Sequence, residues 1–307
     1  MSLSYLFSRN ACQNVGAFCR RLSGDVTKEK LFKLRQQSGL GLDKCRAALI
    51  DKQGNIEEAA AFLKEEAKKH GWERMEKLSS RQSAQGLLGV VHSQDNQSVS
   101  IVEVTCETDF VQRNERFVDL VHDAAISFHK HSQSATSVGP MMAIGNYGFD
   151  QLRDLPLIKG GANLGDHLAE CVGVIGENVV LRRAMTVTSP LLASYVHSVA
   201  VPARDECQFG HICTIADLES APADKAFGDE ERKLGRQLCQ HLLSMNSENP
   251  GLENVTRPYN MEKVLEAHKQ TLADSFVLDE SLTVQELLQN NGLALGGFVR
   301  FQLAEDM

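Results

Sequence analysis

The chain has 307 residues and a mass of 33.8 kDa, long enough to bury a full core in about two or three domains. Its hydrophobic fraction of 42% and charged fraction of 23% are ordinary for a globular protein, and it contains no run of about 18 apolar residues that could span a membrane. The formal net charge of −8 does not favour a nucleic-acid backbone as the main partner.

Residues 1–24 differ in composition from the rest of the chain. They contain Arg9, Arg20 and Arg21, several serine, leucine and phenylalanine residues, and no acid before Asp25. A secretory signal would place its basic residues ahead of a longer apolar run, whereas two of these arginines come at the end of the segment. The composition predicts a mitochondrial transit peptide and location in the matrix; an untargeted tail is the alternative.

The eight cysteines are scattered, and none belongs to a Cys-x-x-Cys pair. Cys207 and Cys213, with His211 between them, form a cluster whose spacing is not that of a zinc site. We therefore expect buried, reduced thiols, with no bound metal and no cofactor. Reduced thiols agree with a reducing compartment.

Residues 27–70 have the pattern of three short helices. Thr27 can cap the first helix, Gly39-Leu40-Gly41 interrupts the pattern, and Gln53-Gly54-Asn55 can end the second helix. The pattern predicts a compact bundle that resembles a ubiquitin-associated (UBA) domain, which by itself indicates a small binding module. Its inward-facing residues would be Leu31, Phe32, Leu34, Leu42, Cys45, Ala48, Leu49, Ile56, Ala59, Ala60 and Leu63.

Residues 71–85 belong to a stretch of mixed charge rich in Lys, Glu, Arg, Ser and Gln. Mixed charge predicts a solvated helix extension and linker rather than an arm that binds nucleic acid. Trp72, the single tryptophan, has no assigned role.

The first part of the core, residues 86–167, begins with two expected strands over 86–92 and 99–105, joined by a hairpin turn at Asp95-Asn96-Gln97. In the second strand apolar residues alternate with polar ones such as Glu103. Alternation of this kind predicts a strand with one buried face. A helix from Asn114 to about His131 follows, with apolar residues at spacings of three and four.

Asp109 and Phe110 therefore lie at a corner between a strand and a helix. An aromatic residue beside an acid at such a corner indicates a recognition tip. The alternative is that Phe110 covers the hydrophobic core beneath the turn.

Within the Gly- and Pro-punctuated stretch 138–168, residues 159–165 are expected to form an ordinary loop, because they lack the Gly-Lys-Ser/Thr end of a phosphate-binding loop. The second part of the core, residues 168–307, repeats the plan of strands followed by a long helix. Its expected strands are 179–187, 195–201, 209–215 and 299–303, and its expected helices are 229–245 and 283–289. The prediction is an α+β fold: a three-helix UBA-like bundle followed by two related α+β subdomains.

The sequence has no Gly-x-Ser-x-Gly nucleophile elbow, no His-Glu-x-x-His zinc helix and no dinucleotide fingerprint after a strand. We therefore expect no covalent catalysis and no small-molecule substrate. A hydrolase built from a His/Cys pair that meets in space stays open as an alternative.

Two segments resemble the elongation factor Ts family. Glu-Val-Thr-Cys-Glu-Thr-Asp-Phe-Val-Gln-Arg, from Glu103 to Arg113, is similar to the family's Thr-Asp-Phe-Val signature. Leu-Arg-Gln-Gln-Ser-Gly-Leu-Gly-Leu-Asp-Lys-Cys-Arg-Ala-Ala-Leu, from Leu34 to Leu49, resembles a second signature. The likeness covers nearly everything after the first two dozen residues. The stretch from Leu218 to Asp229 is too short for the bacterial helical hairpin, which resembles the mitochondrial branch.

The resemblance implies a guanine-nucleotide exchange factor for mitochondrial elongation factor Tu, bound as a 1:1 heterodimer. It implies no direct contact with nucleic acid and no membrane. The alternative is a UBA-like binding or scaffold module without exchange activity. The residues that it implies as partner-binding are Thr108, Asp109, Phe110 and Val111 as an exchange wedge, Arg35 and Leu42 in the bundle, and His197 in the core.

For three of these residues, an interpretation without partner binding also stays open. Leu42 can be a core residue, Arg35 a solvated charge, and His197 a histidine without a role. Asp43 stands where bacterial members often carry a second methionine, which would weaken an apolar contact there.

Overall fold

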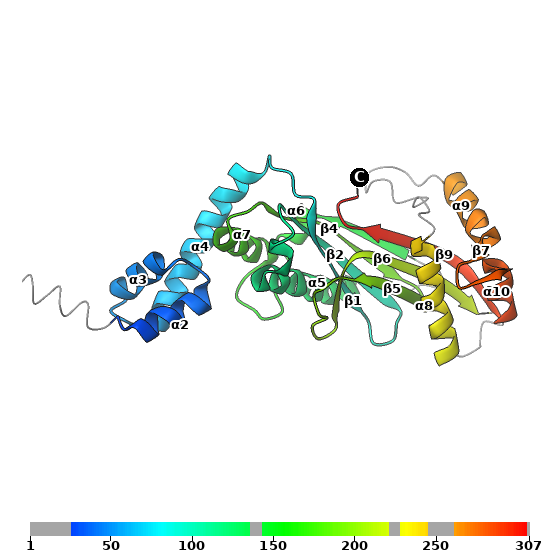
Figure 1. The fold of residues 1–307 in the computed structure, drawn as a ribbon, viewed down its shortest axis with the longest axis horizontal. Helices are drawn as coiled ribbons and strands as arrows, with labels where there is room; N and C mark the ends of the chain where they lie inside the picture. The colour runs from blue at the N-terminus through cyan, green and yellow to red at the C-terminus, as the bar shows by residue number, and fades with distance from the viewer. Residues whose placement is uncertain (1–25, 136–142, 221–227, 245–260, 306–307) are drawn as a thin grey trace, which may run out of the picture. The chain divides into compact units, whose positions relative to one another are not determined.

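The computed structural model describes residues 26–135, 143–220, 228–244 and 261–305. The chain divides into two compact units (Figure 1). One unit comprises Met1–Ser79 with Ala169–Gly176, and the other comprises Ser80–Leu168 with Glu177–Met307. The predicted transit peptide lies outside the described residues. Within those residues, no helix is both long and apolar enough to cross a membrane.

The first unit contains the three predicted helices, α2 (Lys28–Ser38), α3 (Leu42–Asp51) and α4 (Ile56–Leu78). The Thr27 hydroxyl accepts the Lys30 N–H at the start of α2, as the sequence predicts. Gly39 ends the same helix with φ 70°, a left-handed conformation that favours glycine. The buried core of the bundle consists of Leu34, Leu40, Cys45, Ala48, Leu49, Ala59 and Leu63. The structure corrects the expectation that Phe32 faces inward, since this side chain is 59% exposed.

The third helix continues to Leu78, so the first eight residues of the predicted 71–85 linker are helical. The reason is tertiary packing against the second half of α7 (Leu164–Ile175). A Cβ atom on Gly71 would lie 1.7 Å from the backbone oxygen of Ala169. Only glycine therefore allows the backbones of the two helices to approach so closely.

The second unit is built on one antiparallel sheet of seven strands, in the order β3-β4-β2-β1-β6-β5, with β9 also paired to β6. Its strands are β1 (Gln85–His92), β2 (Ser98–Cys106), β3 (Ala143–Gly148), β4 (Val179–Thr188), β5 (Leu192–Ser198), β6 (Cys207–Ser220) and β9 (Leu293–Gln302). Strand β6 pairs with β1 along its first residues and with β9 along the rest. An apolar cluster that includes Val90, Ile101, Ile215 and Phe301 fills the core between these strands.

Helices cover this sheet. Helix α5 (Glu115–Ala135) follows the 3₁₀ turn η1 (Val111–Arg113) and packs on β1 and β2, where a Cβ on Gly89 would lie 2.9 Å from Ala125. Helix α8 (Asp229–Ser244) packs on β5 and β6. The remaining elements are α6 (Phe149–Leu152), α9 (Met261–Ala273), α10 (Val284–Asn290) and the two-stranded sheet of β7 (Ser275–Phe276) and β8 (Asp279–Thr283).

The α+β class is confirmed, as are the hairpin, the long helices after it and after β6, and the C-terminal helix and strand. Strands of both expected subdomains share the one sheet, because β4 lies between β3 and β2. The loop expected over 159–165 is confirmed as far as Asn163, and α7 begins at Leu164. Earlier in the stretch 138–168, the structure has β3 and α6. The proposed boundary between residues 167 and 168 falls inside α7.

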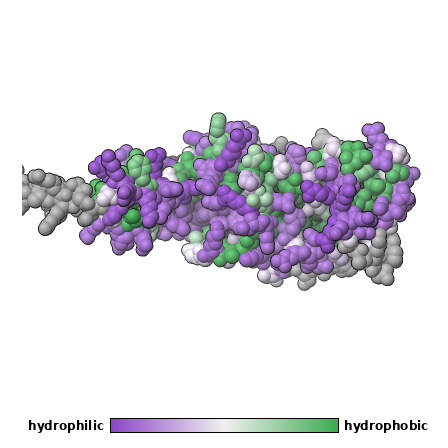
Figure 2. Space-filling model, turned by 60° about the horizontal axis from the view of Figure 1, so that its bottom comes forward, coloured by the Kyte–Doolittle hydropathy of each residue, from purple (hydrophilic) through white to green (hydrophobic). Residues whose placement is uncertain are grey.

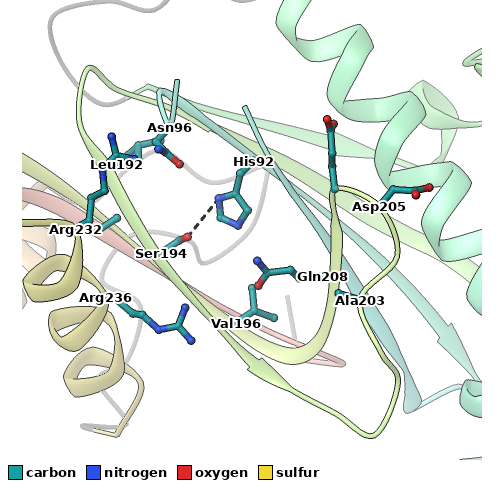
Figure 3. A pocket seen from close by; sticks show the side chains of 12 residues that line it. His92, Asn96, Leu192, Ser194, Val196, Ala203, Asp205, Gln208, Arg232 and Arg236 are labelled. Atoms are coloured by element: carbon teal, nitrogen blue, oxygen red, sulfur yellow. Dashed lines mark hydrogen bonds between the residues drawn. The ribbon is translucent and has the colours of Figure 1, made fainter. Parts of the chain in front are cut away.

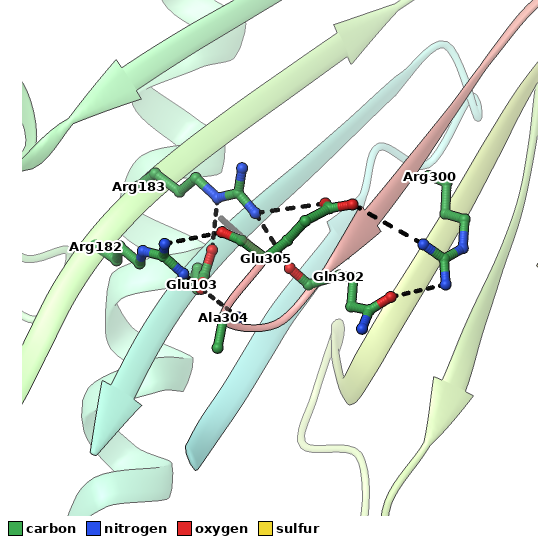
Figure 4. A network of polar contacts seen from close by, with 7 residues as sticks. All are labelled: Glu103, Arg182, Arg183, Arg300, Gln302, Ala304 and Glu305. Atoms are coloured by element: carbon green, nitrogen blue, oxygen red, sulfur yellow. Dashed lines mark hydrogen bonds and ion pairs between the residues drawn. The ribbon is translucent and has the colours of Figure 1, made fainter. Parts of the chain in front are cut away.

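A buried network of charges ties β2 to β4 and to the segment after β9 (Figure 4). Glu103 is completely buried, and its carboxylate accepts hydrogen bonds from Arg183 Nε at 2.6 Å, Arg182 Nη1 at 3.1 Å and the backbone N–H of Ala304 at 2.8 Å. The Arg183 guanidinium also lies over the Phe301 ring, 4.1 Å from its centroid. Because Arg182 and Arg183 are each paired with Glu103, these charges are tolerated within the fold.

Candidate functional site

The corner between β2 and α5 presents an aromatic ring to solvent. Phe110 is 82% exposed, the highest value among the large hydrophobic side chains of the described residues. Asp109 beside it is also exposed, whereas Val111 is only 7% exposed. The reading in which Phe110 covers the core is therefore wrong, because Val111 is the residue of the corner that turns inward.

Hydrogen bonds on the β4 side hold the start of the corner. The Thr108 hydroxyl lies 3.0 Å from Glu177 Oε1 and 3.1 Å from Oε2, so it donates to this carboxylate. The backbone N–H of Asn178 donates to Glu107 Oε1 at 2.7 Å. Two carboxylates thus clamp the corner to the residues before β4, and Thr108 acts as a support rather than as an exposed contact.

The second half of the corner is fixed by local backbone geometry. The N–H of Arg113 donates to the carbonyl of Phe110 at 3.3 Å, and the N–H of Asn114 donates to that of Val111 at 2.8 Å. The Asn114 side chain then accepts the N–H of Arg116 at 3.0 Å, which caps α5 as the sequence predicts. Phe110 consequently stands on a short, hydrogen-bonded turn between two regular elements.

His211 lies behind this turn. In the sequence it stands between Cys207 and Cys213, and the sequence predicts no role for it in the corner. His211 Nε2 lies 3.0 Å from Gln112 Oε1, so the imidazole N–H can donate to the amide oxygen. Burial, with a smaller contribution from the nearby imidazole of His197, keeps the pKa of His211 below its usual value. His211 therefore connects the corner to β6, and the predicted residue His197 is exposed on the neighbouring strand β5.

The thiol of Cys106 lies at the end of β2. Burial and the carboxylate of Glu177 raise the pKa of this thiol to about 12, which keeps it neutral, and it contacts the carbonyl of Thr108 at 3.3 Å. A neutral buried thiol is a poor nucleophile. The cysteines of the described residues are all buried, as expected, and none of them forms a disulfide there: Cys45, Cys106, Cys171, Cys207, Cys213 and Cys239.

The two predicted residues of the helical unit are at its surface. Leu42 is the first residue of α3 and is 37% exposed, so the reading of Leu42 as a core residue is wrong. Arg35 is exposed in the last turn of α2. These residues belong to one unit and the corner belongs to the other.

The corner offers an apolar ring, a neighbouring carboxylate and a firm base. In the described parts of the chain, no group of three or more His, Cys, Asp or Glu side chains could hold a metal ion. On the face shown in Figure 2, hydrophobic residues form small patches among hydrophilic ones.

Comparison with known proteins matches most of the chain. A family model described as "Elongation factor TS" matches residues 107–257, and one described as "Elongation factor Ts, mitochondrial, N-terminal" matches residues 16–73. The first match includes the corner and the second includes the helical bundle.

Similar curated proteins carry one name, "Elongation factor Ts, mitochondrial". The protein from Xenopus laevis is 33% identical over 304 residues, covering 96% of this chain and 92% of the relative. That from Branchiostoma floridae is 34% identical over 315 residues, with 94% and 92% covered, and that from Homo sapiens is 32% identical over 291 residues, with 93% and 86% covered. The chain therefore belongs to the elongation factor Ts family, and within it to the mitochondrial type.

Proposed function

We propose that this protein is the guanine-nucleotide exchange factor for mitochondrial elongation factor Tu and acts in the mitochondrial matrix. It binds the GDP form of this GTPase, promotes GDP release and allows the GTP form to be regenerated during translation elongation. The relatives' shared name supports the partner and the organelle. The observation that carries the mechanism is the exposed Phe110 on a hydrogen-bonded corner.

In this mechanism Asp109 and Phe110 enter the GTPase, and Phe110 acts as an apolar wedge between two of its helices. A translational GTPase holds GDP through its phosphate loop and a Mg²⁺ ion. Displacement of those helices disturbs both contacts, so GDP dissociates. The exchange factor makes and breaks no covalent bond, and it requires neither a general acid nor a general base.

The helical unit and the core supply the remaining contacts in this proposal. Arg35 and Leu42, both exposed, touch the partner from the bundle, and His197 touches it from β5. One copy of the chain binds one copy of the GTPase. Nucleic acid, membrane and small-molecule substrates take no direct part.

The test is release of labelled GDP from purified mitochondrial elongation factor Tu. Phe110→Ala should fold normally, because the ring contributes little to the core, and should lose most of the exchange activity. Ile158→Ala is a matched control: it also shortens an exposed apolar side chain of the same unit (45% exposed) and should keep full activity. Comparable activity of Phe110→Ala and Ile158→Ala would remove Phe110 from the mechanism.

The alternative is a binding or scaffold module without exchange activity, because the bundle alone resembles a small binding domain. That function predicts partner binding that survives replacement of Asp109 and Phe110 by alanine but disappears with residues 27–70. The GDP-release experiment separates the two, since a scaffold leaves the rate of release unchanged.

A further inference from the structure

A cavity of about 540 Å³ lies in the second unit between β5, α8 and the residues around 205. This volume is within the range of roughly 300–1,000 Å³ that is typical of sites for small molecules. None of the proposed partner-binding residues lines it. The function proposed above therefore leaves this cavity without a role.

Two arginines of α8 form one wall. Arg232 and Arg236 are four residues apart, so they lie on the same side of the helix. Neither forms an ion pair with any residue that the structure describes, and both are exposed. The Arg236 guanidinium lies over the Tyr195 ring, 5.2 Å from its centroid. Stacking of this kind uses the flat face and leaves the N–H edge available for a ligand.

Neutral polar groups form the opposite part of the cavity. Ser194 Oγ and His92 Nδ1 are 3.4 Å apart, and the amides of Asn96 and Gln208 also face the space (Figure 3). Arg232 extends beside Asn96, and Arg236 extends toward the side where Ser194 and Gln208 lie (Figure 3). A ligand above Ser194 would therefore have a guanidinium at each end and neutral hydrogen-bonding groups beneath it.

Two acidic residues also line the cavity, and only one of them has a described partner. Asp205 points away from the arginines in Figure 3, and its carboxylate lies 3.4 Å from His122 Nε2. Glu206 is exposed at the rim. The charge is thus divided, with the two cations on α8 and the two acids on the segment before β6.

We propose that this cavity binds the phosphate group of a small molecule. Guanidinium groups match phosphate oxygens through paired N–H donors, and a dianion matches two unpaired arginines better than a single carboxylate does. Ser194 and the two amides can donate further hydrogen bonds to the remaining oxygens. The site is additional to the proposed nucleotide exchange, which it neither requires nor explains.

The test is isothermal titration of the full chain in a chloride buffer, with inorganic phosphate and pyrophosphate as probes and succinate as the carboxylate counterpart. We expect saturable binding of at least one phosphate probe at millimolar or lower concentration, tighter than that of succinate. Absence of saturable binding of both phosphate probes would overturn the proposal, and so would succinate binding that is equal or tighter.

Variants place the binding in the cavity. Arg232→Gln and Arg236→Gln, made separately, should each weaken the affinity for the phosphate probe about tenfold or more, because one lost charge-assisted hydrogen bond costs about that factor. Lys233→Gln is the matched control: it removes the same charge from an exposed position of the same helix but does not line the cavity. If Lys233→Gln weakens the affinity for the phosphate probe equally, only the overall charge of α8 matters, and the proposed site in the cavity is wrong.

Discussion

At the corner of the second unit, two adjacent residues have opposite environments: Phe110 is 82% exposed and Val111 is 7% exposed. Burying a phenylalanine side chain is worth about 1.5–3 kcal/mol relative to leaving it in water. The isolated chain forgoes that stabilisation at position 110. A partner that encloses the ring recovers it, which is why the exposure is better understood as a property of a binding surface than of a core.

Thr108 provides a test of whether the corner has to be held rigidly for nucleotide exchange. Thr108→Val keeps the shape of the side chain and removes the hydrogen bonds to the Glu177 carboxylate at 3.0 and 3.1 Å. We expect the free energy of unfolding to fall by about 1–2 kcal/mol and the GDP-release rate to lie between those of the wild type and Phe110→Ala.

Urea unfolding and the GDP-release assay measure the two quantities. Ser134→Ala, which removes an exposed hydrogen bond within α5, is the control and should leave the release rate unchanged. A wild-type release rate in Thr108→Val would show that the hydrogen bonds only stabilise the fold.

His92 makes stability depend on pH. Burial, with a smaller contribution from His129, lowers the pKa of His92 to about 4 from its usual 6.5. Between these values the unfolded chain takes up a proton that the folded chain does not, so the free energy of unfolding decreases as the pH falls from 6.5 towards 4. The slope from this one group is at most about 1.4 kcal/mol per pH unit.

His92→Gln keeps a polar group beside Ser194 but cannot titrate, so its free energy of unfolding should decrease less over this window. Urea unfolding at several pH values measures the slopes. Ser194→Ala removes the hydrogen-bonding neighbour, keeps the imidazole and should retain the wild-type slope. Identical slopes in His92→Gln and the wild type would contradict the assignment.

At the scale of the element, β2 shows what alternation can and cannot predict. The pattern predicts the strand and its hairpin correctly, but it assigns Glu103 to an open polar face, whereas every residue of β2 is buried. Arg182 and Arg183 on β4, together with the segment that contains Ala304, shield the Glu103 carboxylate from solvent. Contacts between residues so far apart in the chain leave no periodic signal in either segment.

Glu103→Gln tests this network. The substitution preserves the size of the side chain but leaves two arginines without their shared carboxylate. Removing one partner of a buried ion pair usually costs about 3–5 kcal/mol, so we expect a loss of that order in the free energy of unfolding. Urea unfolding with Glu280→Gln as the control, at an exposed position of β8, measures the difference. A loss no larger than that of Glu280→Gln would show that the network contributes no net stability.

Other elements depend on packing that local patterns do not contain. Gly165 ends the expected loop, although it lies inside α7, and a Cβ on Gly173 of the same helix would lie 2.1 Å from the backbone oxygen of Ala67. Gly173 allows a close contact between two helices and does not form a turn.

In the candidate site, the corner itself could be predicted from the strand and helix patterns, because the two elements that flank it are each encoded by a continuous stretch of sequence. Glu177, just before β4, and His211, on β6, support it from distant parts of the chain, and their role could not be predicted from the sequence.

At the scale of the whole molecule, the proposed exchange reaction is a coupling between two binding equilibria. If the exchange factor raises the dissociation constant of GDP by a given factor, GDP must raise the dissociation constant of the exchange factor by the same factor. We expect a 1:1 complex by light scattering without nucleotide, and dissociation of that complex by excess GDP. Titrations of the GTPase with each ligand, in the presence and absence of the other, measure both factors. Unequal factors would contradict a simple ternary cycle.

The buried carboxylate of β2 also has a consequence for the order in which the protein is made. Ala304 follows Glu103 by 201 residues. At roughly 5–20 residues per second, a ribosome needs about 10–40 seconds to cover that distance. During this interval β2 carries the negative charge of Glu103, but the segment around Ala304 that shields this carboxylate in the folded protein has not yet been made. The central sheet can therefore close only late in synthesis, and the growing chain has to be kept from aggregating until then.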